Sequence, residues 1–180
     1  MDEERIKKLV RELIAEIGED PTREGLTKTP ERVADAYKEI FGGYDSNSEL
    51  SVQFSEDSEV VVIRDIQFYS MCEHHILPFF GKIHIAYSPN GRVFGISKLV
   101  RLVEKYSKRL QIQERMTINI ATALQDHLKP KGVAIRVSAK HSCMSNRGAM
   151  QEKSIMESLH FMGVYDKDSS KRQEFLQMVK

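Results

Sequence analysis

The sequence of 180 residues has few cysteines, no excess of charge of one sign and no long apolar run. Its two cysteines, Cys72 and Cys143, are too few for the dense disulfide framework of a small secreted domain. Lysine and arginine number 27 against 26 acidic residues, so the net charge of +1 gives no polycationic surface. No apolar run approaches the roughly 20 residues that span a bilayer. We therefore expect neither a nucleic-acid nor a membrane partner.

The composition and the N-terminus predict a globular protein of the cytoplasm. A hydrophobic content of 41% and a charged content of 29% lie outside the range of disordered chains. The first residues, MDEERIKKLVRELIAEIG, are charged and amphipathic and lack the apolar core of a signal peptide. Because the sequence texture changes at residue 59, we expect an N-terminal helical region and loop over 1–58 and a second domain over 59–180.

Hydrophobic periodicity predicts the order helix, helix, then β-β-α-α-β-β. The expected helices are 3–17, 29–41, 97–110, about 113–128 and 169–179; the expected extended segments are 59–70, 81–89, 92–95 and 132–143. Residues 44–58 lack a period and are expected to form a loop, whereas 152–165 fit no single pattern. The class is therefore α+β, with an antiparallel sheet and a helix pair on one side. Because such a sheet leaves its edges open, we expect self-association to complete it.

Both cysteines stand within three residues of a histidine. Cys72 and His75 are three apart in Cys-Glu-His-His, a spacing that lets two side chains of a turn converge on one ion. If the strand that precedes Cys143 continues to it, His141 and Cys143 project to the same face. Thiolate together with imidazole suits zinc. The sequence therefore predicts a metal site.

The spacing leaves several readings of this site open. It does not say which of His74, His75 and His141 binds the metal. Three ligands and an open fourth position would make a catalytic zinc site, and four ligands would make a structural one. A histidine left over beside a three-ligand ion would suit proton transfer. Buried cysteines that act as small hydrophobic residues are the alternative to any metal.

Two further groups of polar residues carry weaker signals. The run Gln-Ile-Gln-Glu-Arg at 111–115 is typical of a solvated helix start. Lys98 and Arg101, three apart at a predicted helix start, share a face that could meet an anion. Arg147 follows Cys143 closely and places a cation near any metal there, and Arg32 is a further cation. Each of these residues taken alone is typical of a protein surface.

Taken together, the motifs resemble the GTP cyclohydrolase I family. The matching segments are Cys-Glu-His-His at 72–75, Gly-Ile-Ser-Lys-Leu at 95–99, the run at 107–117, His-Ser-Cys-Met-Ser-Asn-Arg-Gly at 141–148, and 20–26 and 29–32 near the N-terminus. The resemblance covers nearly the whole chain. It implies a tunnelling fold whose subunits join their sheets into a ring, a decamer of two stacked pentamers with active sites at subunit interfaces. It also implies conversion of GTP and water to 7,8-dihydroneopterin triphosphate and formate.

The resemblance assigns roles to residues that match the family motifs. Zn²⁺ would be bound by Cys72, His75 and Cys143, and protons would be transferred by His74 and His141. Guanine would be held by Glu114, with Gln113 beside it. The triphosphate would be received by Ser97, Lys98, Arg101, Arg147 and Arg32, with neighbouring chains contributing.

One segment departs from the family pattern. After Arg147 and Gly148 the family commonly has a lysine-containing stretch and then Ser-x-Thr-x-Thr, whereas Met156 and Ser158 stand here at the threonine positions. Two alternatives to the full reaction are therefore considered for this chain. One is a divergent paralogue that opens the guanine imidazole ring without closing a pterin, and the other is a non-catalytic zinc- or nucleotide-binding protein.

Overall fold

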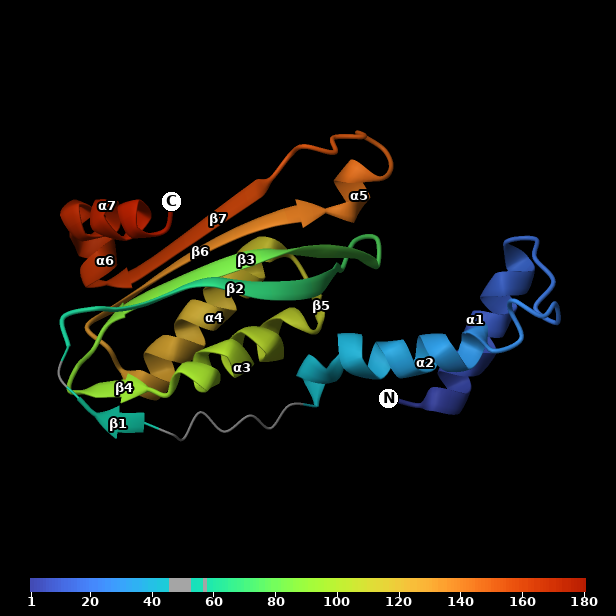
Figure 1. The fold of residues 1–180 in the computed structure, drawn as a ribbon, viewed down its shortest axis with the longest axis horizontal. Coiled ribbons are helices and arrows are strands. Elements are labelled where there is room, and N and C mark those ends of the chain that lie inside the picture. The colour runs from blue at the N-terminus through green and yellow to red at the C-terminus, as the bar shows by residue number, and fades with distance from the viewer. Residues whose placement is uncertain (46–52, 57) are drawn as a thin grey trace. The chain divides into compact units, whose positions relative to one another are not determined.

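A computed structural model describes residues 1–45, 53–56 and 58–180 (Figure 1). The chain forms two compact units, Met1–Gly42 and Gly43–Lys180. The domain boundary expected between residues 58 and 59 stays a prediction. Among the described residues, no helix has the length and apolar character needed to cross a membrane.

The first unit consists of the two helices that the hydrophobic period predicts. Helix α1 spans Glu3–Glu16 and α2 spans Thr29–Ile40. Gly18, with φ of +93°, lies just beyond α1, in a backbone conformation that favours glycine. The ammonium of Lys38 on α2 lies 2.7 Å from a carboxylate oxygen of Glu3 on α1 and links the two helices. The helices expected here are therefore confirmed.

The second unit follows the predicted β-β-α-α-β-β order, with short elements between the main ones. Its elements are η1 (Gly42–Tyr44), β1 (Gln53–Ser55), β2 (Val61–Cys72), β3 (Leu77–Ser88), β4 (Arg92–Phe94), α3 (Ile96–Ser107), β5 (Leu110–Gln111), α4 (Gln113–Leu128), β6 (Gly132–His141), α5 (Ser142–Ser145), β7 (Met156–Gly163), α6 (Val164–Lys167) and α7 (Ser169–Met178). The main sheet has the order β5-β2-β3-β6-β7, in which only the short β2–β5 pair is parallel. The α+β class and the antiparallel sheet are confirmed.

The main sheet has two different faces. Helices α3 and α4 cover one face, as Figure 1 shows, and this face holds the larger core. Residues such as Ile83, Ile135, Leu102 and Met116 are fully buried there. On the opposite face, α6 and α7 cover one end of the sheet through a smaller cluster around Phe175. We call these the helix face and the open face.

The structure corrects two details of the predicted strands. Within the expected loop 44–58, Gln53–Ser55 forms β1 and pairs with β4; residues 46–52 and 57 lie outside the described residues. Strand β6 ends at His141, and Cys143 lies in the short helix α5 instead of continuing the strand. The segment 152–165, which fitted no single pattern, contains β7 and the start of α6.

Candidate functional site

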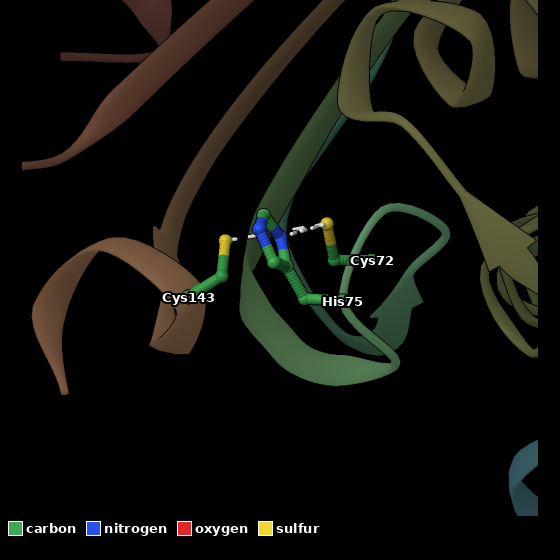
Figure 2. Close-up of side chains that lie close together, drawn as sticks. All are labelled: Cys72, His75 and Cys143. Atoms are coloured by element: carbon green, nitrogen blue, oxygen red, sulfur yellow. Dashed lines mark hydrogen bonds between the residues drawn. The ribbon is translucent and has the colours of Figure 1, made fainter. Parts of the chain in front are cut away.

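The first part of the site is the turn that joins β2 to β3. Strand β2 ends at Cys72, whose carbonyl accepts hydrogen bonds from the backbone N–H groups of His75 at 3.4 Å and Ile76 at 2.8 Å. Ile76 has φ of +52° and reverses the chain into β3. This tight turn brings the imidazole of His75 back to the thiol of Cys72, with Nδ1 3.8 Å from Sγ (Figure 2).

The second part of the site lies at the end of β6, the strand that pairs with β3. Strands β3 and β6 are antiparallel with Phe79 opposite His141, so the end of β6 lies beside the β2–β3 turn. The chain then enters α5, and Cys143 points toward Cys72 and His75 (Figure 2). The two sulfur atoms are 4.0 Å apart, and the ligand atoms of the three residues all lie within 4.8 Å of one another.

These three donors fit a zinc ion. With Zn–S of about 2.3 Å and Zn–N of about 2.1 Å, tetrahedral coordination separates the ligand atoms by about 3.6–3.8 Å. The observed separations of 4.0 Å between the sulfurs and 3.8 Å between Cys72 Sγ and His75 Nδ1 are close to this. Both cysteines are free thiols, and two sulfurs with one imidazole form a donor set that zinc prefers. The group Cys72, His75 and Cys143 could therefore hold a metal ion.

Three neighbouring influences act on the pKa of the Cys143 thiol. Burial raises the pKa of the Cys143 thiol, and the neighbouring sulfur of Cys72 raises it further. The positive charge of Arg147 opposes both effects and lowers the pKa of this thiol. Two thiolates so close together repel each other, and a bound cation would offset that repulsion.

Two more histidines lie around this group. The Nδ1 atom of His74, an exposed residue, is 4.0 Å from Cys72 Sγ. His141 is half-buried and stacks on Phe79, with ring centroids 4.5 Å apart and planes within 7°. Burial lowers the pKa of His141, and the negative charge of Glu114 opposes that shift. The structure therefore brings both candidate proton-transfer residues to the elements that carry the metal group.

Gln113, the first residue of α4, lies in the protein interior with 1% of its surface exposed. Its Oε1 is 2.9 Å from Nε2 of His141, and its Nε2 donates to backbone and side-chain oxygens of β6 and β7. Its expected place beside guanine stays a prediction. Ser158 and Thr117, which share this network, were given no role by the sequence motifs.

A salt bridge joins the metal-binding turn to α4. Glu73, inside the Cys-Glu-His-His motif, accepts two hydrogen bonds from the guanidinium of Arg115, at 2.5 and 3.1 Å. Arg115 holds the pKa of the Glu73 carboxyl below its usual range. Both residues belong to motifs visible in the sequence, but only the fold shows that they pair.

The remaining predicted residues are spread over several elements. Glu114 is exposed in the first turn of α4. Ser97, Lys98 and Arg101 lie within the first two turns of α3, and Arg147 follows α5. Arg32 lies on α2 in the first unit, which is described by itself. The substrate-binding roles of all these residues stay predictions.

Comparison with known proteins decides the family. A family described as GTP cyclohydrolase I matches residues 6–180. The chain belongs to this family. The GTP cyclohydrolase 1 of Rickettsia bellii is 51% identical over 97% of this chain and 94% of its own length, and that of Rickettsia felis is 49% identical over 97% and 95%. A solved structure of the archaeosine synthase QueF-Like in the apo form aligns with a TM-score of 0.49 at 16% identity, over 60% of this chain and 97% of that one.

Family membership confirms the resemblance that the motifs predicted and the expectation that the chain is an enzyme of the GTP cyclohydrolase I type. The chain spans nearly the full length of these relatives, so the match is not limited to one motif. The reaction products, the metal and the assembly are matters for the proposal below.

Proposed function

We propose that this protein hydrolyses GTP to 7,8-dihydroneopterin triphosphate and formate in the cytoplasm, with Zn²⁺ held by Cys72, His75 and Cys143. The observation that carries the proposal is the convergence of these three side chains from two separate motifs in a chain of the GTP cyclohydrolase I family. Four residues around the convergence, His74, His141, Glu114 and Arg147, have the chemistry that the reaction needs.

The first requirement is a nucleophile that reacts with C8 of guanine near neutral pH. Bound Zn²⁺ supplies Lewis acidity that lowers the pKa of water to about 7. Cys72, His75 and Cys143 would hold the ion, and three protein ligands are typical of catalytic zinc sites. The Glu73–Arg115 salt bridge holds the turn that carries two of these ligands against α4.

The second requirement is proton transfer. Each bond from C8 to a ring nitrogen breaks more readily once that nitrogen is protonated, and His141 and His74 would supply the protons. Opening of the ribose and its rearrangement to a ketose, which condenses with the freed amine, again consist of proton transfers. Burial lowers the pKa of His141 and so favours its neutral ring, which can accept a proton before it delivers one.

The third requirement is recognition of GTP. The carboxylate of Glu114 can accept two hydrogen bonds from N1–H and the amino group of guanine, a donor pair that adenine lacks. A site built on such a pair can discriminate by roughly 10⁴-fold or more. Ser97, Lys98, Arg101, Arg147 and Arg32 would receive the triphosphate, since arginine binds phosphate oxygens in pairs.

The fourth part of the proposal is a ring oligomer, a decamer with active sites at subunit interfaces. The open face of the sheet carries large exposed apolar side chains: Tyr69 is 68% exposed and Leu159 46% exposed. Tyr69 stacks on Phe80 at 5.9 Å, and Phe80 is itself 40% exposed. Exposed apolar side chains that lie together, as Tyr69 and Phe80 do, favour contact with another subunit.

The test is turnover of GTP by the purified protein, before and after removal of metal with a chelator. We expect formate and a pterin that fluoresces after oxidation, loss of both on chelation and recovery of both with Zn²⁺. Formate without pterin would favour the ring-opening paralogue. Tight GTP binding without turnover would favour a non-catalytic protein. Equal rates with and without metal would overturn the zinc-dependent reaction.

A matched pair of variants separates loss of metal from general damage to α5. Replacing the ligand in Cys143→Ser should lower bound zinc and lower turnover by at least about 100-fold, since even partners outside the ligand shell cost 10–100-fold. Met144→Leu, at the next position of the same helix, conserves volume and should leave both quantities unchanged. Elemental analysis and GTP turnover measure the two effects on one sample.

A further inference from the structure

The buried carboxamide of Gln113 connects His141 to strand β7. Its Nε2 lies 3.2 Å from the carbonyl oxygen of Val137, 3.1 Å from that of Met156 and 3.1 Å from Oγ of Ser158. Its Oε1 lies 2.9 Å from Nε2 of His141. Every polar atom of this side chain therefore has a partner inside the protein.

These partners fix which way the carboxamide faces. Backbone carbonyl oxygens only accept hydrogen bonds, so the side of the Gln113 amide that faces Val137 and Met156 must be the NH₂ group. A flipped amide would place its own oxygen against two carbonyl oxygens. The atom that faces His141 is consequently an acceptor, and Nε2 of His141 must carry a hydrogen to bond to it.

Two hydroxyl groups support the same orientation. Thr117 Oγ donates to the carbonyl oxygen of Gln113 at 2.7 Å, which uses its single proton. Thr117 must then accept from Ser158 Oγ, 2.7 Å away, so that Ser158 in turn accepts from the Gln113 amide. The two protons of the Gln113 amide serve three acceptors, so one of these hydrogen bonds is shared between two oxygens, while the direction from Gln113 through Ser158 to Thr117 is fixed.

Phe79 restricts the remaining freedom of the imidazole. Its ring is parallel to that of His141 within 7° at a centroid distance of 4.5 Å, which restricts rotation of the imidazole out of its plane. The hydrogen bond to Gln113 then restricts rotation within the plane. The neutral ring is held in one orientation and one tautomer.

We propose that Gln113 is a positioning residue that, with Ser158, holds His141 as its Nε2–H tautomer and leaves Nδ1 as the nitrogen that exchanges protons with substrate. This inference rests on the proposed role of His141 in the reaction. It also gives the divergent segment a function, because Ser158 supplies a hydroxyl where the family commonly has threonine. The hydroxyl is the feature that the two residues share.

The kinetic test compares three substitutions in the full chain. Gln113→Met keeps length and volume but removes the amide, and it should lower kcat by about 10- to 100-fold with KM changed less than about threefold. Ser158→Ala removes one acceptor and should lower kcat by about 3- to 10-fold. Ser158→Thr keeps the hydroxyl and should retain the wild-type kcat, since a β-branched residue suits a strand.

Two controls accompany these variants. Ser138→Ala removes a hydroxyl that hydrogen-bonds to Glu157 and to no member of the Gln113 network, and it should leave kcat unchanged. Bound zinc should stay equal in all variants, because none of these positions belongs to the metal group. A KM change with constant kcat, or equal kcat values for Ser158→Ala and Ser158→Thr, would overturn the positioning role.

The tautomer itself is read by ¹⁵N NMR of histidine-labelled protein, with His141 assigned from a His141→Asn sample. We expect a protonated Nε2 and an unprotonated Nδ1 in the wild type, and a mixture of both tautomers in Gln113→Met. Protonated Nδ1 in the wild type would overturn the inference. This readout needs no turnover, so a wild-type protein that lacks GTP activity would refute the proposed function without deciding the tautomer.

Discussion

The two faces of the main sheet each carry a histidine, and the two histidines are held in different ways. His141 on the helix face contacts uncharged groups, the carboxamide of Gln113 and the ring of Phe79. His84 on the open face is 7% exposed, and its Nδ1 accepts a hydrogen bond at 3.3 Å from the backbone N–H of Asp65. Asp65, with φ of +59°, lies where the β2–β3 register shifts.

The surroundings explain what each histidine can do. Around His84 the charges come in opposite pairs, Lys82 with Asp65 at 2.7 Å and Arg136 with Glu157 at 2.8 Å. Arg136 also donates to the carbonyl oxygen of Val179 at the end of α7. These contacts hold the sheet and the C-terminal helix together, whereas the network of His141 orients one imidazole beside the metal group. We interpret the open-face histidine as structural and the helix-face histidine as functional.

The largest expected effect comes from removing the helix-face imidazole. His141→Asn should lower kcat for GTP by about 10²- to 10⁴-fold, because proton transfer by a positioned side chain contributes that much. His160→Asn is the matched control, since His160 is also partly buried and lies on β7 opposite Ile135. Steady-state turnover of the two variants measures this effect. A His141 variant as active as the His160 variant would show that the helix-face histidine has no functional role.

A smaller effect, on stability, is expected from the open face. Arg136→Met removes the hydrogen bonds to Glu157 and to the Val179 carbonyl, and should lower the free energy of unfolding by about 1–3 kcal/mol. Lys82→Met, on the same face, removes a solvent-exposed ion pair and should change stability little. Urea unfolding at one fixed protein concentration measures both, because oligomerisation would make the midpoint depend on concentration.

Turnover sharpens the result for Arg136→Met. The folded variant should keep its kcat, since Arg136 contacts the sheet edge and α7 and not the metal group. A large loss of kcat with unchanged stability would mean that the open face takes part in the reaction. The open face would then not be purely structural.

The smallest expected effect is a change in pH dependence from His84→Gln. Burial lowers the pKa of His84; Asp65 and Glu157 oppose the shift, and Arg136 and Lys82 add to it. Below about pH 6.5 the unfolded chain takes up a proton that the folded chain still excludes, so stability is lost as pH falls through the lowered folded pKa. Each unit of pKa difference corresponds to about 1.4 kcal/mol.

The variant should therefore flatten the acid limb of the stability curve below pH 6.5 and leave the pH dependence of stability above pH 7 unchanged. His127→Gln, at an exposed position near the end of α4, should keep the wild-type slope. Unfolding midpoints between pH 4.5 and pH 8, taken at one salt concentration, give the comparison. An acid limb as steep in His84→Gln as in the wild type would show that His84 is not the titrating group.

Much of the secondary structure could be predicted because segments with a clear hydrophobic periodicity alternate with turn residues that end them. The stripe Ile6, Leu9, Leu13 and the glycine after it define α1, and the alternation of Val133, Ile135 and Val137 defines β6. Strand β1 could not be predicted in the same way. Its three residues are polar or exposed, and only pairing with β4 makes them a strand.

The residue types of the metal group were also visible, as two cysteines each within three positions of a histidine. The sequence alone left open which histidine joins them, and its strand geometry for Cys143 was wrong because β6 ends at His141. The pairing of Phe79 with His141 brings Cys143 to the β2–β3 turn, and the distances between ligand atoms there make His75 the third member of the group. Those contacts join residues about 70 positions apart, which local periodicity does not encode.

By itself, the sequence determined the family, the order of the helices and strands, and the supply of sulfur, imidazole and charged side chains, because these depend on residue types and short spacings. Tertiary structure alone decided that Gln113 is buried against His141 and Ser158, and that Glu73 meets Arg115. The physical reason is that a polar side chain at a helix start satisfies its hydrogen bonds with water or with protein, and only the packing of α4 on the sheet removes the water.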